Sequence, residues 1–111
     1  IEALENPEMV DIPSSLLHPD NYVLQVKGNS MIDEQIHDKD YIVARKTNTA
    51  RSGQIVVALI NGEATLKYYI HGPEGVELHP RNPDFPIIKV DPKDDFHING
   101  VLLYSFRNYL N

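Results

Sequence analysis

Short segments in which apolar and polar residues alternate follow one another along this chain, with glycine and proline between them. This pattern is typical of β-strands, because successive side chains of a strand face opposite sides of the sheet. Residues 21–27 alternate in this way and predict a half-buried strand. Residues 54–60 are almost entirely apolar and predict a central strand that is covered on both faces. The pair Asn61-Gly62 then predicts a tight hairpin turn, with residues 63–70 as its return strand.

The rest of the pattern predicts more short strands and very little helix. Further strands are predicted at residues 41–45, 76–79, 87–90, 95–98 and 101–106. Helical turns are predicted only at residues 14–17, after Pro13, and at residues 31–36. We therefore expect an all-β (mainly β) fold, a small and strongly bent sheet that forms a barrel or a sandwich. Residues 1–12 are acidic and broken by proline, so we expect a peripheral segment there and one domain over residues 13–111.

Charge and composition exclude several classes of function. Sixteen acidic residues against ten basic ones give a net charge of -6. This charge argues against nucleic-acid binding by the chain itself, because phosphate binding relies on clustered Lys and Arg. The absence of cysteine excludes disulfides, thiolate metal sites and a cysteine nucleophile, and it fits a cytoplasmic protein. The longest apolar run, residues 55–60, is too short to span a membrane, so no membrane partner is expected.

No pattern in the chain indicates a metal or a cofactor. His71 and His79 are the two histidines closest in sequence, but their spacing fits no common zinc pattern. Acidic residues gather at positions 33–40 without the spacing or the central glycine of an EF-hand. We therefore expect neither a metal nor a cofactor. Because the chain begins at Ile1 rather than Met, we also expect that part of the protein precedes it.

The stretch Gly28-Asn29-Ser30 ends the first long predicted strand and places a serine in a sharp turn. A serine in such a turn projects its hydroxyl away from the sheet. Backbone N–H groups around Asn29 and Ser30 can then point at a developing oxyanion. A serine that only caps a turn is the commoner interpretation of this pattern, so the motif alone is weak evidence for catalysis.

A serine nucleophile needs a base, and two kinds are available. The five histidines leave a Ser-His-Asp triad open, although none of them lies in a recognisable triad motif. Lys67 stands alone among apolar and aromatic residues, where burial would lower its pKa because desolvation disfavours the ammonium. To act as a base near neutrality, this pKa must fall from about 10.4 by roughly three units, which corresponds to about 4 kcal/mol. The pattern also allows an ordinary strand lysine that reaches solvent.

Three ordered motifs give this serine and this lysine a more specific meaning. They are Gly28-Asn29-Ser30-Met31, Gly53-Gln54-Ile55-Val56-Val57-Ala58 and Glu63-Ala64-Thr65-Leu66-Lys67, with further similarity at residues 38–43 and 78–83. From about Ile12 to Phe106 the chain resembles the C-terminal self-cleaving peptidase domain of the LexA repressor family, which also occurs in phage repressors and in UmuD. The resemblance implies that Ser30 is the nucleophile and Lys67 the general base.

The same resemblance implies supporting roles for three residues. Thr65 would orient the Lys67 amine, Met31 would shape an apolar cleft, and Asn29 would lie beside the oxyanion. The sequence departs from the family pattern at Asn29, where an acidic residue or Met is common, and at Tyr68-Tyr69, which replace the usual basic residue. These changes affect the expected rim of the cleft and not the expected chemistry.

The resemblance further implies an autoproteolytic domain of an SOS-type repressor, whose self-cleavage relieves repression after DNA damage. Family members cut an Ala-Gly or Cys-Gly bond, and this chain contains neither pair. We therefore expect a catalytic domain without its own scissile loop, which would reach DNA only through a domain before Ile1. The expected partners are a RecA–single-stranded DNA filament as co-protease and a second copy of the chain, paired through Leu102–Phe106.

Three alternatives stay open. A UmuD-like protein, an accessory of a translesion polymerase, would carry a short arm in place of the DNA-binding domain. Type I signal peptidases share the Ser-Met turn and the lysine base, but the lack of a membrane segment disfavours them. A non-catalytic dimerisation module with a vestigial dyad belongs to a different class, which a pH–rate profile would separate from an enzyme.

Overall fold

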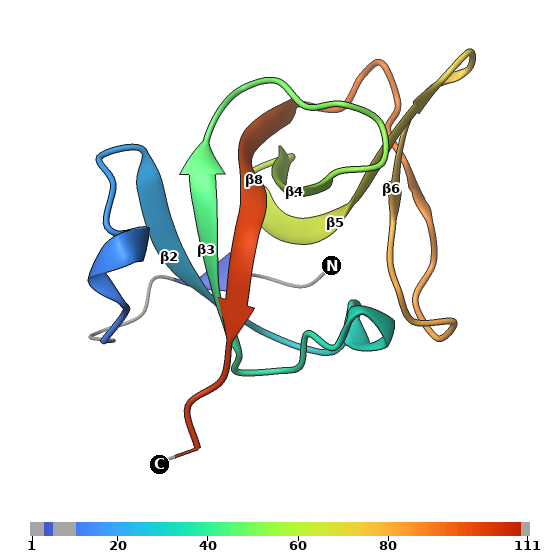
Figure 1. Ribbon diagram of the computed structural model, residues 1–111. Coiled ribbons are helices and arrows are strands. Elements are labelled where there is room, and N and C mark those ends of the chain that lie inside the picture. Colours follow the sequence, from blue (N-terminus) through green and yellow to red (C-terminus); the bar gives the residue numbers. More distant parts are fainter. Residues whose placement is uncertain (1–3, 6–10, 110–111) are drawn as a thin grey trace.

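In the part of the chain that the structure describes, eight antiparallel strands form one sheet, in the order β1-β2-β3-β8-β4-β5-β6-β7. Its central strands are seen in Figure 1. The structure, a computed structural model, describes residues 4, 5 and 11–109. The strands are β1 (Leu4–Glu5), β2 (Asn21–Val26), β3 (Tyr41–Lys46), β4 (Ile55–Ile60), β5 (Glu63–Gly72), β6 (Gly75–His79), β7 (Ile88–Lys89) and β8 (Phe96–Phe106). Two 3-10 turns, η1 (Ser14–Leu16) and η2 (Ile32–Glu34), are the helical elements of the described residues.

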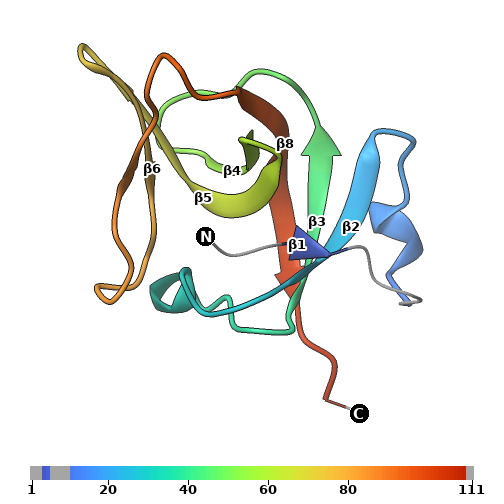
Figure 2. The same cartoon turned by 180° about the vertical axis from the view of Figure 1, so that it is seen from behind.

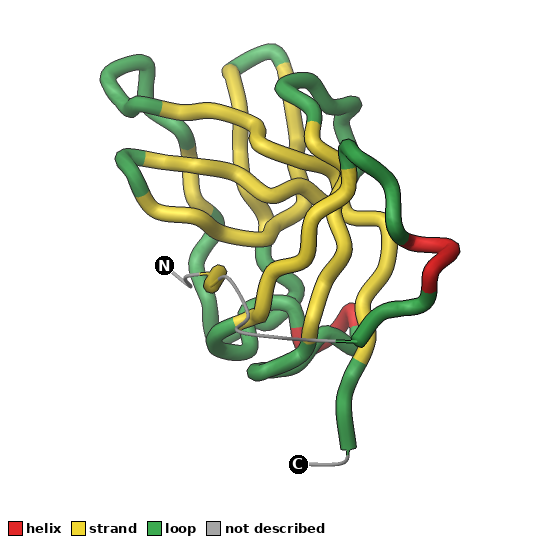
Figure 3. Tube along the Cα trace, turned by 90° about the vertical axis from the view of Figure 1, so that its left-hand side faces the viewer, coloured by secondary structure: helices red, strands yellow, loops and turns green. Residues whose placement is uncertain are grey.

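The all-β prediction is confirmed, but the sheet is not closed into a barrel. β1 and β7 are its two edges, and they do not pair with each other. The strands bend strongly across the sheet, and the two 3-10 turns lie at its margins (Figure 3). Both turns are shorter than the helical segments predicted at residues 14–17 and 31–36, because neither segment has the length to sustain α-helical hydrogen bonds.

The β4–β5 hairpin forms where the sequence predicts it. Asn61 and Gly62 have φ angles of 52° and 84°, the left-handed pair that a type I′ turn requires. β4 is covered on both faces, since Val56 and Val57 belong to two different core clusters. β5 continues to Gly72, two residues beyond the predicted end. This hairpin carries Thr65 and Lys67.

The two strands predicted at residues 95–98 and 101–106 are one strand, β8. Its ladder to β4 pairs Val57 with Gly100 and Ala58 with Ile98, so the intervening Asn99 is absorbed as an irregularity. The Tyr22 hydroxyl donates to Asn99 Oδ1 at 2.7 Å. A Cβ at Gly100 would collide with the Tyr22 phenol. The glycine therefore allows the Tyr22 ring to approach the backbone of β8 closely, and it does not mark the end of a strand.

The N-terminal segment contributes one short strand to the sheet. β1 pairs with β2, with Leu4 opposite Val26 and Glu5 opposite Gln25. Seen from behind, β1 is the short strand next to β2 at the edge of the sheet (Figure 2). Leu4 is partly buried against the first core cluster. The prediction for residues 1–3 and 6–10 falls outside the described residues.

Candidate active site

Ser30 lies in the turn that joins β2 to η2, and one side of this turn is held by the loop of residues 37–40. Gly28 takes a φ of 86°, which turns the chain away from the sheet at no steric cost to a glycine. The Gly28 N–H donates to Asp38 Oδ1 at 2.6 Å, and the Asp38 N–H donates to Asn29 Oδ1 at 3.0 Å. The turn is therefore fixed by reciprocal bonds to a second loop.

The other side of the turn is held by the segment that follows β6. The Arg81 N–H donates to the Ser30 carbonyl at 2.7 Å, and the Asp33 N–H donates to the Arg81 carbonyl at 2.8 Å. Asn82 Nδ2 donates to the Asn29 carbonyl at 2.9 Å. With the carbonyls of Asn29 and Ser30 both engaged, the peptide planes around the serine have little freedom to rotate.

The side chain of Lys67 extends from β5 to this serine. Lys67 Nζ lies 2.7 Å from Ser30 Oγ, 2.7 Å from Thr65 Oγ1 and 3.1 Å from the Leu66 carbonyl oxygen. Ser30 and Thr65 are 0% exposed and Lys67 is 2% exposed. The structure thus brings together, away from solvent, three of the residues singled out in the sequence.

Asn29 and Met31, the other two residues singled out, flank the serine in different environments. Asn29 is exposed, and its side-chain oxygen is used by the Asp38 N–H. Met31 is 1% exposed and packs in the first core cluster. The backbone N–H groups of both residues have no hydrogen-bond acceptor within the described part of the chain. Two backbone donors beside the serine are therefore available for an anionic oxygen.

The pattern of the sequence gave no indication of an ion pair between the buried Asp40 and the partly exposed Arg107 at the base of the 37–40 loop. Arg107, just after β8, donates to both oxygens of Asp40 at 2.6 and 2.9 Å, and the His37 N–H adds a third bond at 2.8 Å. Burial alone would raise the pKa of Asp40, but the Arg107 guanidinium and the His37 N–H outweigh it and hold this pKa below its usual value. Residues 67 positions apart form this pair, so no local pattern could have revealed it.

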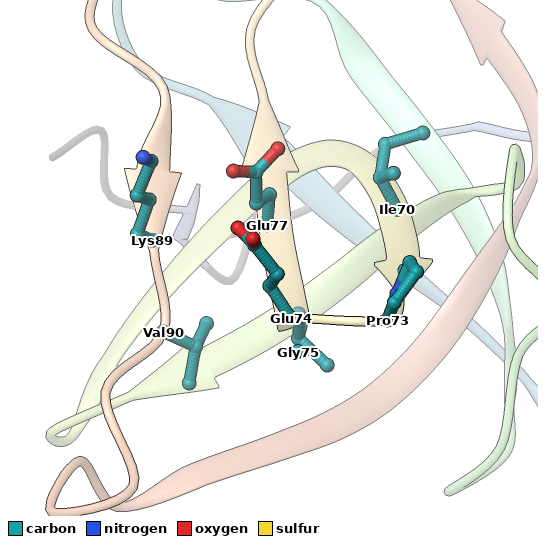
Figure 4. A pocket seen from close by; sticks show the side chains of 9 residues that line it. Ile70, Pro73, Glu74, Gly75, Glu77, Lys89 and Val90 are labelled. Carbon is teal, nitrogen blue, oxygen red and sulfur yellow. The ribbon is translucent and has the colours of Figure 1, made fainter.

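The cavity drawn in Figure 4 lies elsewhere. It has a volume of about 330 Å³ and is bounded by the far end of the β5–β6 hairpin and by β7, with Ile70, Glu74, Glu77 and Lys89 in its wall. Its β5 wall extends to Gly72, five residues beyond Lys67 and so roughly 17 Å along the strand. The cavity therefore does not include the hydrogen-bonded pair of Ser30 and Lys67.

Two structural features bear on other kinds of site. Among residues 4, 5 and 11–109, no helix is long and apolar enough to cross a membrane. Within the same residues, no three His, Asp or Glu side chains gather closely enough to hold a metal ion.

The chain is similar to one family of peptidases and to several repressors. The family described as Peptidase S24-like matches residues 1–103. A LexA repressor from Syntrophotalea carbinolica is 44% identical over 98% of this chain, and one from Pseudothermotoga lettingae is 45% identical over 98%. A LexA repressor from Erythrobacter litoralis is 42% identical over the same share. The chain covers 54%, 56% and 47% of these proteins, so it spans about half the length of the relatives it matches.

We expect the variant Asp40→Asn to be destabilised by about 2 kcal/mol at pH 7, because a charge-assisted pair of hydrogen bonds is lost. A carboxylate whose folded pKa is depressed stabilises the fold above its unfolded pKa, near 3.9, and loses this effect as the pH falls through the folded pKa. The difference from the wild type should therefore shrink below about pH 4. Urea unfolding at several pH values measures it, with the exposed Asp84→Asn as control. A difference that is independent of pH would contradict this account.

Proposed function

Because this chain belongs to the Peptidase S24-like family, we propose that it is a serine peptidase in which Ser30 is the nucleophile and Lys67 the general base. The observation that carries the proposal is the 2.7 Å separation of Lys67 Nζ from Ser30 Oγ in a buried site. The two residues are 37 positions apart in the sequence. Burial of an amine lowers the stability of the fold, so we expect a buried amine beside a buried hydroxyl to have a function.

The proposed proton transfer follows from the contacts of the amine. A neutral amine has two N–H donors and one lone pair. The Leu66 carbonyl and the Thr65 hydroxyl can each accept an N–H of the neutral amine, and its lone pair can take the proton of Ser30 Oγ, which lies 2.7 Å away. Burial favours this neutral form, because desolvation disfavours the ammonium. Thr65 is then a positioning residue that orients the amine.

In the reaction we propose, Ser30 Oγ attacks the carbonyl carbon of a peptide bond while Lys67 takes its proton. The backbone N–H groups of Asn29 and Met31 donate to the oxyanion of the tetrahedral intermediate. Lys67 then returns the proton to the leaving amine, which leaves an acyl ester on Ser30. A water molecule, deprotonated by Lys67, hydrolyses this ester and restores the hydroxyl.

We propose that the substrate is an extended peptide that takes the place of β1 beside β2. In the antiparallel pairing of β1 with β2, each step toward the N-terminus of β1 is a step along β2 toward Ser30. A strand that enters along this line would run past the serine and present its carbonyls to it. The 111 residues contain no Ala-Gly pair, so the bond that the family resemblance suggests is not among them.

At the level of the whole protein, we propose the C-terminal half of a cytoplasmic LexA-type repressor over residues 13–111. Self-cleavage would separate it from a DNA-binding domain and relieve repression after DNA damage, with a RecA–single-stranded DNA filament as the activating partner. Relatives named LexA repressor, of which this chain spans about half, support this proposal. A UmuD-like accessory protein is the alternative, and the residues preceding the domain distinguish the two.

We further propose a homodimer that pairs through Leu102–Phe106. The ladder between β8 and β4 ends at Val101, so residues 102–106 have a strand partner only on the β3 side within the described residues. Tyr104, in this stretch, is 53% exposed. Sedimentation at a concentration on the order of tens of micromolar should show a dimer, and replacement of Leu103 by Lys should shift it toward monomer. A wild-type monomer at this concentration would contradict the proposal.

The catalytic proposal is tested with a quenched fluorescent peptide that contains a central Ala-Gly bond. We expect cleavage whose rate rises about tenfold per pH unit until Lys67 is fully deprotonated, because only the neutral amine accepts the proton. Ser30→Ala and Lys67→Ala should both abolish cleavage. The matched controls are Ser15→Ala and Lys93→Ala, which change an exposed serine and an exposed lysine. Cleavage that persists in Ser30→Ala, or that does not depend on pH, would overturn the dyad.

A further inference from the structure

Three side chains beside the dyad form a cluster that the proposed reaction does not use. They are Glu34 of η2, Tyr68 of β5 and Arg81 of the segment after β6. The Tyr68 hydroxyl donates to Glu34 Oε1 at 2.6 Å. Arg81 Nε lies 3.6 Å from the same oxygen, and the Arg81 guanidinium sits 3.8 Å from the centroid of the Tyr68 ring. We call these three residues the Tyr68 cluster.

Each member of the Tyr68 cluster belongs to an element that fixes part of the dyad. Tyr68 follows Lys67 directly in β5. Glu34 ends the 3-10 turn that begins two residues after Ser30, and its N–H donates to the Met31 carbonyl at 3.0 Å. Arg81 receives and gives the backbone bonds that hold Ser30 and Asp33. The cluster therefore ties together, through side chains, the three segments on which the Ser30–Lys67 separation depends.

The chemistry of the cluster favours a geometric role over a contribution to global stability. The side chains of Arg81 and Glu34 are 41% and 34% exposed, and ion pairs at such positions stabilise proteins little. The hydrogen bond between the Tyr68 phenol and the Glu34 carboxylate is stronger than these ion pairs, because it is short, charge-assisted and partly buried. The Glu34 hydrogen bond, with a smaller effect of burial, raises the pKa of Tyr68, so the phenol keeps its proton and continues to donate at neutral pH.

We propose that the Tyr68 cluster is a positioning device that holds Lys67 Nζ at hydrogen-bonding distance from Ser30 Oγ. Through its bond to Glu34, Tyr68 links β5, which carries Lys67, to the turn that follows Ser30. Arg81 packs on the Tyr68 ring, and its backbone N–H donates to the Ser30 carbonyl. Misplacement of a reacting group by about 1 Å can cost on the order of a hundredfold in rate, so a single bond at this point has a large effect. This inference rests on the proposed function of Ser30 and Lys67.

The test is the steady-state cleavage of the Ala-Gly peptide by Tyr68→Phe, which keeps the ring under Arg81 and removes only the hydroxyl. We expect kcat to fall about tenfold with KM within about twofold of the wild type, because substrate contacts are unchanged while the dyad is misaligned. The thermal unfolding midpoint should fall by no more than about 8 °C, the effect of one lost hydrogen bond, so the variant stays folded in the assay. Tyr41→Phe is the matched control, since Tyr41 is also a half-buried strand tyrosine and stacks on Phe106 away from the dyad.

A double-variant cycle identifies Glu34 as the partner of the hydroxyl. Glu34→Gln should lower kcat in the same way, and the double variant Tyr68→Phe/Glu34→Gln should be no slower than the slower single variant. A higher KM with unchanged kcat would overturn the inference in favour of a substrate subsite. Unchanged kinetics would overturn the inference, because the cluster would then have no role in the reaction. A loss of kcat that only follows a lowered unfolding midpoint would overturn it too, because the cluster would then have only a structural role. If Ser30→Ala still cleaves, the proposed function fails, which is a separate result.

Discussion

The interaction on which the rest of this structure depends is the contact between a buried lysine amine and a buried serine hydroxyl. Lys67 is 2% exposed, and an ammonium is expensive to remove from water unless polar partners replace its hydration. Ser30, Thr65 and the Leu66 carbonyl supply such partners within 3.1 Å. Burial disfavours the ammonium, and the neutral amine that we propose as the base keeps hydrogen-bond partners in these groups.

This contact requires that β5, which carries Lys67, and the turn that carries Ser30 keep a fixed relative position. Several parts of the fold hold these two segments in place. The β4–β5 hairpin sets Lys67 through a tight turn and a strand covered on both faces. The loop of residues 37–40, itself anchored to Arg107 through Asp40, holds the turn before Ser30. The segment at Arg81 and Asn82 holds the carbonyls of Ser30 and Asn29. The relative position of Ser30 and Lys67 thus results from contacts between residues far apart in the chain.

The distance in sequence between contacting residues decides what could be predicted. The Asn61-Gly62 hairpin and the apolar strand before it depend on local preferences, and both were predicted correctly. The continuous strand β8 was not, because the irregularity at Asn99 is defined by its partner strands and by Tyr22, 77 residues away. For the candidate site, the residue pattern suggested a serine and a lysine, but only the family resemblance paired them. The Tyr68–Glu34 and Arg107–Asp40 contacts join positions 34 and 67 residues apart and have no signature in the local pattern.

The central claim is that Lys67 is a neutral base in the folded protein, and nuclear magnetic resonance tests it most directly. In a chain with ¹³C-labelled lysine, the Cε shift of Lys67 reports its charge at each pH, and Lys67→Ala assigns the signal. The account predicts that this signal titrates well below the value of about 10.4 for an exposed lysine, while the exposed lysines of the chain titrate near it. A Lys67 signal that titrates together with the exposed lysines would contradict the claim.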